Sequence, residues 1–215
     1  HYNTNYHKAK EIQETIIENG SNAEVFGSDL LDTNAAKILI KDFVNRFGGI
    51  DILVNNAGAI YGNTSFLKLD EESWNNTFAL NIKAPFFLIQ EAFPIMSSQG
   101  GGKIVNISSI SANYGGSSLS LHYACAKSAL DCLTIGMARE GAPYNILVNS
   151  IRAGFIDTLA HKKIKRSETD IQDRINKILL KRAGQPEDIA RMVLYLASNA
   201  GNYITGEIIT IAGGD

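Results

Sequence analysis

The chain has 215 residues, of which 45% are hydrophobic, so it is long enough to form one large globular domain with a substantial core. A formal net charge of −2 at pH 7 argues against nucleic-acid binding as a main task, and no apolar run approaches the roughly 18 residues that a membrane span needs. The four histidines are scattered and form no ligand cluster, so we expect no catalytic metal.

Segments typical of helices and strands alternate along the whole chain. Asp32 or Thr33 is a candidate cap for one predicted helix and Asp70 for the next, whereas Pro85 and Pro94 are expected to bend or break the helix that follows Asp70. The expected elements are a strand end at 1–3, a helix at 4–19, a short strand at 23–27, a helix at 33–47, a strand at 50–54, a long helix at 71–96, a strand at 103–107, a helix at 121–139, a strand at 146–151, a helix from Pro186 and a last strand at 207–211.

This alternation predicts right-handed βαβ crossovers and a parallel sheet with helices on both faces, which is an α/β fold. The apolar run at 50–54 is typical of a parallel strand that is covered on both faces. No repeat, low-complexity segment or linker interrupts the pattern, so residues 1–215 are expected to form a single domain.

The two cysteines, Cys125 and Cys132, lie seven positions apart in one predicted helix. At about 1.5 Å of rise per residue they are some 10 Å apart, which is too far for a disulfide. Reduced thiols and the lack of a signal peptide indicate a cytoplasmic protein.

Tyr123 and Lys127 lie four positions apart in the same predicted helix, so their side chains fall on one face, one turn apart. A lysine ammonium close to a phenol favours the phenolate, so it is expected to lower the tyrosine pKa from about 10 and to suit the pair to proton transfer. Tyr6 and Lys10 have the same spacing on a polar helix face, which shows that the spacing alone is weak evidence. Tyr123 differs because a predicted strand ends in Ser109, fourteen positions upstream, where a hydroxyl can hold the same substrate oxygen.

Further motifs surround this pair. A strand ends in Asn55-Asn56-Ala57-Gly58, Asn81 lies in the long predicted helix, and Val148-Asn149-Ser150-Ile151-Arg152 forms a later strand. Together with the serine, tyrosine and lysine, these motifs resemble the short-chain dehydrogenase/reductase family along essentially the whole chain. The resemblance implies a Rossmann-like, doubly wound sheet and an oxidoreductase that uses NAD(P)H.

The resemblance also implies roles for individual residues. The matching positions of the family make Asn81, Ser109, Tyr123 and Lys127 the catalytic set, with Asn81 supporting a bound water that links the lysine to solvent. In the family the acid that matches Asp29 contacts the adenine, and the backbone at the Ile156 position touches the nicotinamide amide. The implied cofactor-binding residues are Asn3, Asp29, Leu30, Asn56, Ala57, Gly58, Tyr123, Lys127, Ile156 and Thr158.

The sequence departs from the family pattern at three places. Ala153 stands where the family usually has proline, and Ala212 where it usually has aspartate. The family also opens with a strand and a glycine-rich turn that holds the pyrophosphate, whereas Gly100-Gly101-Gly102 precedes a strand and cannot serve as that turn.

We therefore expect the fold to be incomplete at its N-terminus by about thirty residues, which in the family supply two central strands. The strand at 23–27 would then lack a neighbour. Two explanations remain open: the sequence is a piece of a longer chain, or it is a natural truncation that has lost cofactor binding.

Three functional hypotheses follow. The first is a carbonyl–alcohol oxidoreductase, with 3-oxoacyl-acyl-carrier-protein reductases as the nearest resemblance; the second is a sugar or polyol dehydrogenase of the same family; the third is a non-catalytic member used for regulation or assembly. Tyr2-Asn3-Thr4-Asn5 contains no acid to bind ribose hydroxyls, which favours NADP(H) over NAD(H), although no arginine is there to clamp a 2′-phosphate.

Two expectations concern partners. The predicted helices at 71–96 and 121–139 carry more apolar surface than one sheet face needs, and in the family they pair across a dimer axis, so we expect a homotetramer. Lys162, Lys163, Lys165 and Arg166 fall within five positions, which indicates either a solvated helix face or a docking patch for an acidic carrier protein that delivers a thioester substrate.

Overall fold

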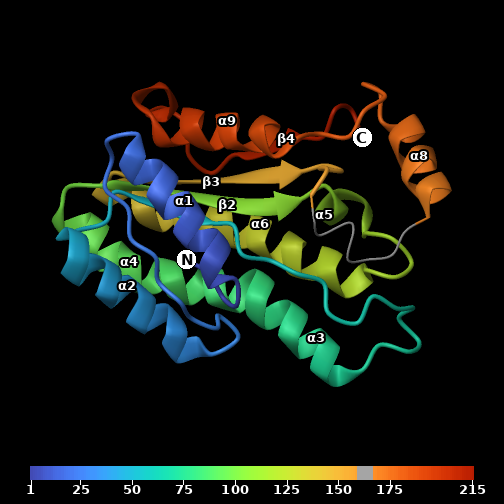
Figure 1. Cartoon of the computed structure of the whole chain (residues 1–215), viewed down its shortest axis with the longest axis horizontal. Coiled ribbons are helices and arrows are strands. Elements are labelled where there is room, and N and C mark those ends of the chain that lie inside the picture. The colour runs from blue at the N-terminus through green and yellow to red at the C-terminus, as the bar shows by residue number, and fades with distance from the viewer. Residues whose placement is uncertain (159–166) are drawn as a thin grey trace.

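A parallel sheet forms the centre of the computed structural model, which describes residues 1–158 and 167–215 (Figure 1). In the described part of the chain the sheet has four strands, ordered β1 (Ile52–Asn55), β2 (Gly102–Ser109), β3 (Ile146–Ala153) and β4 (Ile208–Ile211). The pairing of β2 with β3 runs from Gly102 opposite Ile146 to Ser109 opposite Ala153, so both strands end at one level.

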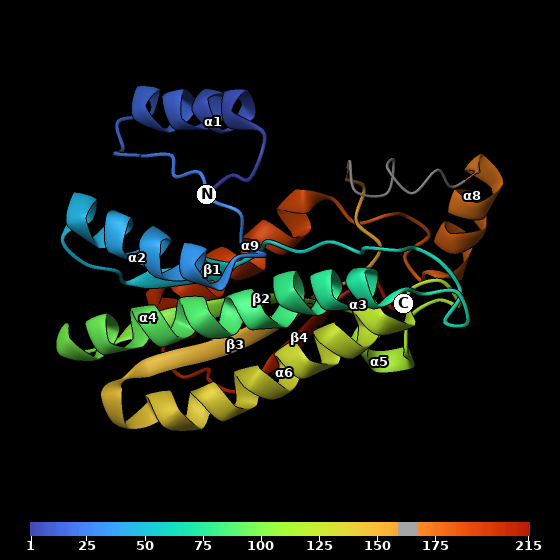
Figure 2. The same ribbon diagram turned by 90° about the horizontal axis from the view of Figure 1, so that it is seen from below.

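Helices cover both faces of this sheet, as the α/β prediction required. α4 and α6 lie against one face with α2 beside α4 in the same layer, and α9 lies on the other face (Figures 1 and 2). The helical elements are α1 (Tyr6–Glu18), α2 (Thr33–Phe47), α3 (Glu71–Phe78), η1 (Ala79–Lys83), α4 (Ala84–Ser98), α5 (Ser111–Tyr114), α6 (Leu121–Gly141), η2 (Ala142–Tyr144), α8 (Glu168–Lys177), α9 (Pro186–Ala197) and η3 (Asn199–Gly201).

The core is split between the two faces by the alternation of side chains along β2. Ile104 points into the larger cluster with Ile89 and Met96 of α4, whereas the next residue, Val105, packs with Leu196 of α9. Successive side chains of a strand point to opposite faces, so a strand covered on both sides needs apolar residues at both positions. The adjacent apolar residues Ile104 and Val105 of β2 are explained by this double coverage.

Most helix boundaries lie where the sequence predicts them. The Asp32 side chain accepts a hydrogen bond from the backbone of the first turn of α2, and Asp70 does the same for α3. Gly48 ends α2 in the left-handed conformation, and Pro186 opens α9, where its missing N–H costs nothing.

The predicted helix at 71–96 is interrupted next to Pro85, as expected, but not at Pro94. The break is the π-helical turn η1, which lies before Pro85, while Pro94 is accommodated inside α4. A π-helical turn widens the helix by one residue, and such turns are frequent at functional sites. Here the wider turn carries the buried Asn81.

Two predictions about the N-terminal third are wrong. The residues at 23–27 do not form a strand with any described segment and make one isolated bridge, from Tyr2 to Gly27. β1 is not covered on both faces, because Ile52 and Val54 are 45% and 39% exposed. α1 stands apart from the sheet, so it does not cover these residues (Figure 2).

Two helices were not predicted from the sequence: α5, which lies between the strand at 103–107 and the helix at 121–139, and α8, which precedes Pro186. α8 begins with a capping box, in which Ser167 and Asp170 bond to each other's backbone N–H. That serine–aspartate spacing was a readable signal of a helix start. The proposed docking residues Lys162, Lys163, Lys165 and Arg166 lie outside the described residues.

Candidate active site

The carboxyl ends of three neighbouring strands lie at one edge of the sheet. Asn55 ends β1 opposite Asn106, and Ser109 ends β2 opposite Ala153. The motifs that the sequence singled out follow these ends directly, at 56–58 after β1 and at 154–158 after β3. In open parallel sheets, ligands bind outside the carboxyl ends of the strands, so the structure gathers the predicted motifs at the expected edge.

Tyr123 lies in the first turn of α6, half-buried and hydrogen-bonded to Ser109. Burial raises the pKa of its phenol to about 12, the hydrogen bond from Ser109 opposes this rise, and the nearby Tyr114 adds to it. The phenol is therefore fully protonated at neutral pH and suited to act as a proton donor. The sequence-based expectation that Lys127 lowers the pKa of Tyr123 is not met in this structure.

The position of the lysine explains that difference. Lys127 Nζ donates a hydrogen bond of 2.7 Å to the carbonyl oxygen of Ile107 on β2, and it lies 5.7 Å from the centre of the Tyr123 ring rather than on the hydroxyl. Lys127 is only 3% exposed, so burial lowers the pKa of its own ammonium to about 8, and the neighbouring Asp131 partly opposes that shift. The ammonium of Lys127 lies close to the Tyr123 ring, but its hydrogen bond goes to a backbone carbonyl and not to the phenol oxygen.

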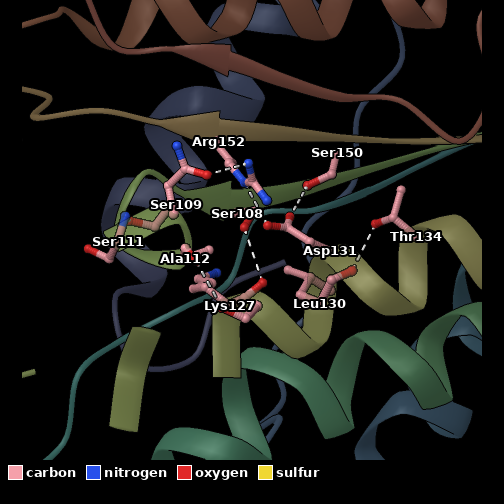
Figure 3. Close-up of polar contacts among 12 residues, drawn as sticks. Ser108, Ser109, Ser111, Ala112, Lys127, Leu130, Asp131, Thr134, Ser150 and Arg152 are labelled. Atoms are coloured by element: carbon pink, nitrogen blue, oxygen red, sulfur yellow. Dashed lines mark hydrogen bonds and ion pairs between the residues drawn. The ribbon is translucent and has the colours of Figure 1, made fainter. Parts of the chain in front are cut away.

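Ser109 is held in place by the turn that follows β2. Its Oγ accepts a hydrogen bond of 3.1 Å from the backbone N–H of Ser111, the first residue of α5. The preceding residue, Ser108, points to the opposite side and donates to the backbone oxygen of Lys127 at 3.3 Å (Figure 3). Two adjacent serines therefore fix the strand end to α5 and to α6.

Asn81 and Gly58 complete the site from the other side. The Asn81 amide nitrogen donates to the carbonyl oxygens of Ala59 and Thr77 at 2.7 and 2.8 Å, which fixes the loop after β1 to the π-helical turn. Within the described part of the chain, Asn81 Oδ1 is buried and has no hydrogen-bond partner. A buried acceptor left without a partner is costly, so it marks a place for a donor such as a bound water.

The backbone of Gly58 passes close to these polar atoms. A Cβ at this position would lie 2.8 Å from Asn81 Oδ1 and 3.2 Å from Lys127 Nζ. The backbone of Gly58 is thus packed closely against a hydrogen-bond acceptor and a cationic donor, and this position has no room for a side chain. Lys127 Nζ has N–H donors beyond the one given to Ile107, which fits the hydroxyl-rich ribose next to a nicotinamide ring.

The remaining predicted cofactor residues fall into two groups. Asn56, Ala57 and Leu30 line a cleft of about 450 Å³ whose other walls are largely apolar. Ile156 is buried and bridges Gly184. The other members of the set are the half-buried Thr158 and the exposed Asn3 and Asp29, the last two close in sequence to the Tyr2–Gly27 bridge.

Sequence reasoning missed three buried polar residues of α6, His122, Asp131 and Thr134, of which the first two bear on the site. His122 is hidden from solvent, with Nε2 2.7 Å from the carbonyl oxygen of Tyr61. Because a carbonyl oxygen only accepts, Nε2 carries the proton, and the histidine ties α6 to the loop after β1. Asp131 is the second residue; its spacing of four from Lys127 could have shown that it shares a face with the lysine.

In the described residues no group of three or more histidine, cysteine, aspartate or glutamate side chains is placed to hold a metal. Cys125 and Cys132 are free and exposed, as their separation predicts. Among the described helices, none combines the length and apolar character needed to cross a bilayer.

Comparison with known proteins yields consistent matches. A family model described as Enoyl-(Acyl carrier protein) reductase matches residues 2–215. The 3-oxoacyl-[acyl-carrier-protein] reductase FabG of Thermotoga maritima is 36% identical over 186 residues, which cover 86% of this chain and 74% of that protein.

Two solved structures superimpose closely. A blue fluorescent protein from a metagenomic library, in complex with NADPH, has a TM-score of 0.90 at 29% identity and covers 97% of this chain and 82% of its own. A Sinorhizobium meliloti 1021 protein assigned to the short-chain alcohol dehydrogenases has a TM-score of 0.88 at 34% identity, covering 95% of this chain and 81% of its own.

Proposed function

The chain belongs to the short-chain dehydrogenase/reductase family and is an NAD(P)-dependent oxidoreductase, and on that premise we propose that it reduces 3-oxoacyl thioesters. The observation that supports this most strongly is the arrangement of Ser109, Tyr123 and Lys127 at one sheet edge. The name of the Thermotoga relative supplies the substrate class.

A bound nicotinamide dinucleotide would supply the hydride of the reaction. In this proposal Lys127 holds the ribose hydroxyls, and the residues that line the cleft hold the rest of the dinucleotide. The cofactor-binding set is the one drawn from the sequence: Asn3, Asp29, Leu30, Asn56, Ala57, Gly58, Tyr123, Lys127, Ile156 and Thr158. NADPH is preferred over NADH, because Tyr2-Asn3-Thr4-Asn5 presents no carboxylate to repel a 2′-phosphate.

The protein's own residues move the proton. Ser109 Oγ donates a hydrogen bond to the substrate carbonyl oxygen and orients it toward the phenol. Tyr123, protonated at neutral pH because burial raises its pKa to about 12, gives its proton to that oxygen as the alcohol forms. Asn81 Oδ1 accepts a hydrogen bond from a bound water, through which solvent returns the proton.

The test is a substrate panel, followed by the absorbance of the reduced nicotinamide. We expect acetoacetyl thioesters to be reduced with NADPH, and kcat/KM with NADH to be lower. A preference for NADH of tenfold or more would reject the cofactor assignment. Activity on a sugar or polyol with none on any thioester would replace the acyl proposal with the dehydrogenase alternative, and the absence of cofactor binding would favour a non-catalytic role.

Carrier binding and assembly extend this proposal. If Lys162, Lys163, Lys165 and Arg166 dock an acidic carrier protein, replacing all four with alanine raises KM for the carrier-bound substrate far more than for a small free thioester. Equal effects on both substrates would reject the docking patch.

A homotetramer in the cytoplasm is the proposed assembly. Phe86 of α4 and Ile135 of α6 are exposed large apolar residues on the two helices expected to pair. Light scattering at micromolar concentration should give the mass of four chains, and a monomer alone would refute it.

A further inference from the structure

Asp131 continues the line of Tyr123 and Lys127 along α6. The three residues are spaced four apart, so they share one face of the helix. Lys127 and Asp131 lie on the side of α6 that is turned toward the sheet, where they bond to β2 and β3 (Figure 3). Asp131 is 4% exposed, which is unusual for a carboxylate and demands compensation by hydrogen bonds or opposite charge.

Both carboxylate oxygens of Asp131 have partners on β3. Ser150 Oγ donates to Oδ1 at 3.0 Å, and Arg152 Nε donates to Oδ2 at 2.8 Å (Figure 3). The same guanidinium donates to Asn113 Oδ1 on α5 at 3.0 Å. Since α5 begins two residues after Ser109, this chain of hydrogen bonds joins the helix of the lysine to the turn that holds the serine.

Lys127 is the other buried charge of this face. Its ammonium donates to the backbone oxygen of Ile107, which is a neutral group. Among the described residues, the negative charge that balances the ammonium therefore comes from a side chain to which Lys127 is not hydrogen-bonded. Two titratable groups act near it: Tyr123, whose ring centre lies 5.7 Å from Nζ, and Asp131, one turn further along α6. Arg152 from β3 pairs with Asp131, and Tyr114 at the end of α5 acts on Tyr123. The π-helical turn presents Asn81 and the loop after β1 presents Gly58, and neither side chain titrates. Asp131 is therefore the one anion of this group at neutral pH.

We propose that Asp131 is a positioning residue that keeps Lys127 cationic, and that Arg152 limits the strength of this effect by neutralising part of the carboxylate. The inference rests on the proposed function, because the task of Lys127 is taken from it. Asp131 itself touches neither substrate nor cofactor in this account, and it acts through the lysine.

Replacing Asp131 and replacing Arg152, the two members of the ion pair, should shift the pKa of Lys127 in opposite directions. Asp131→Asn keeps the shape of the side chain but removes the anion, so the pKa of Lys127 falls further below about 8. Arg152→Met removes the cation and leaves the carboxylate to act alone on the ammonium, so the pKa of Lys127 rises. Ser150→Ala removes one hydrogen bond and no charge, so it is the matched control.

The direct measurement is an NMR titration of ¹³C-labelled lysine side chains in the protein without cofactor, with the Lys127 resonance assigned by its loss in Lys127→Arg. We expect a downward shift of about one pKa unit or more in Asp131→Asn, an upward shift in Arg152→Met and little change in Ser150→Ala. An unchanged pKa in Asp131→Asn, or shifts of the same sign in the first two variants, would overturn the proposal. If Asp131→Asn does not fold, the sign of the Arg152→Met shift decides alone.

A second measurement uses the pH profile of kcat/KM for carbonyl reduction. The alkaline limb, where Lys127 loses its proton, should move to lower pH in Asp131→Asn and to higher pH in Arg152→Met. For each unit by which the pKa of Lys127 changes, the limb should move by about one pH unit. A merely structural role would lower activity at every pH without moving the limb. If the NMR shifts occur while the activity profile stays fixed, the tuning is real and the catalytic role of Lys127 is wrong, so the two failures are distinguishable.

Discussion

Replacing Tyr123 with phenylalanine removes one oxygen atom and little else. The ring keeps its place in the first turn of α6, and the ammonium of Lys127 keeps its position 5.7 Å from the ring centre. The hydrogen bond with Ser109 is lost, and so is the proton that the mechanism transfers. Tyr123→Phe therefore separates proton donation from binding.

The magnitudes follow from this geometry. One hydrogen bond is worth about 1 kcal/mol net, so the melting temperature should change by no more than about 2–4 °C. Cofactor affinity should stay within about threefold, since Lys127, Gly58 and Asn81 are untouched. Turnover should fall by about 10²–10⁴-fold, the usual contribution of a positioned general acid.

The assay compares kcat for thioester reduction, cofactor Kd by fluorescence and the melting temperature of the wild type and the variant. Tyr6→Phe is the matched control, because Tyr6 and Lys10 repeat the spacing on the exposed helix α1 and should show no effect. A kcat within tenfold of the wild type in Tyr123→Phe, with the protein folded and cofactor bound, would remove Tyr123 from the proton-transfer role.

Further predictions concern Lys127 and two glycines. Because burial places the pKa of Lys127 at about 8 in the folded protein, below its ordinary value of 10.5, the stability linked to this lysine is lost as pH falls through about 8. The free energy of unfolding should thus rise by on the order of 3 kcal/mol between about pH 8 and pH 10.5, as measured by denaturant titration, and this rise should vanish in Lys127→Met. Above about pH 10, ionisation of Tyr123 in the unfolded chain opposes the rise, since its folded pKa is about 12. Gly58→Ala should weaken cofactor binding at least tenfold, because its Cβ would lie 2.8 Å from Asn81 Oδ1. The matched control is Gly136→Ala inside α6, where the added Cβ meets nothing within 4 Å and should raise the free energy of unfolding by about 1 kcal/mol. Equal cofactor affinities of the two variants would contradict the proposed ribose site.

The sequence was sufficient for those features that depend on local pattern. The caps at Asp32 and Asp70, the start of α9 at Pro186 and the alternation of strands and helices were all predicted, because each is decided by neighbouring residues. The sequence could not predict whether both faces of β1 are buried. An apolar strand has the same sequence pattern whether or not another segment packs on it, and only the structure shows that Ile52 is exposed.

The candidate site divides along the same boundary. The motif spacing placed Ser109, Tyr123 and Lys127 together, and the structure brings them to one sheet edge. The pKa values of Tyr123 and Lys127 could not be predicted from their spacing. The pKa of a buried group depends on how far it is desolvated and on which hydrogen bonds it and its neighbour make. Lys127 bonds the backbone of Ile107, and no sequence pattern carries that information.

The central claim is that this protein moves a hydride between a nicotinamide and a carbonyl carbon. The most direct measurement supplies NADPH deuterated at the transferable position of the ring, together with an acetoacetyl thioester, and analyses the product by mass spectrometry and NMR. The account predicts one deuterium on the carbon that bears the new hydroxyl, formed by the wild type and at least about a hundredfold more slowly by Tyr123→Phe. A hydroxyl product without deuterium at that carbon, or no product although NADPH binds, would contradict it.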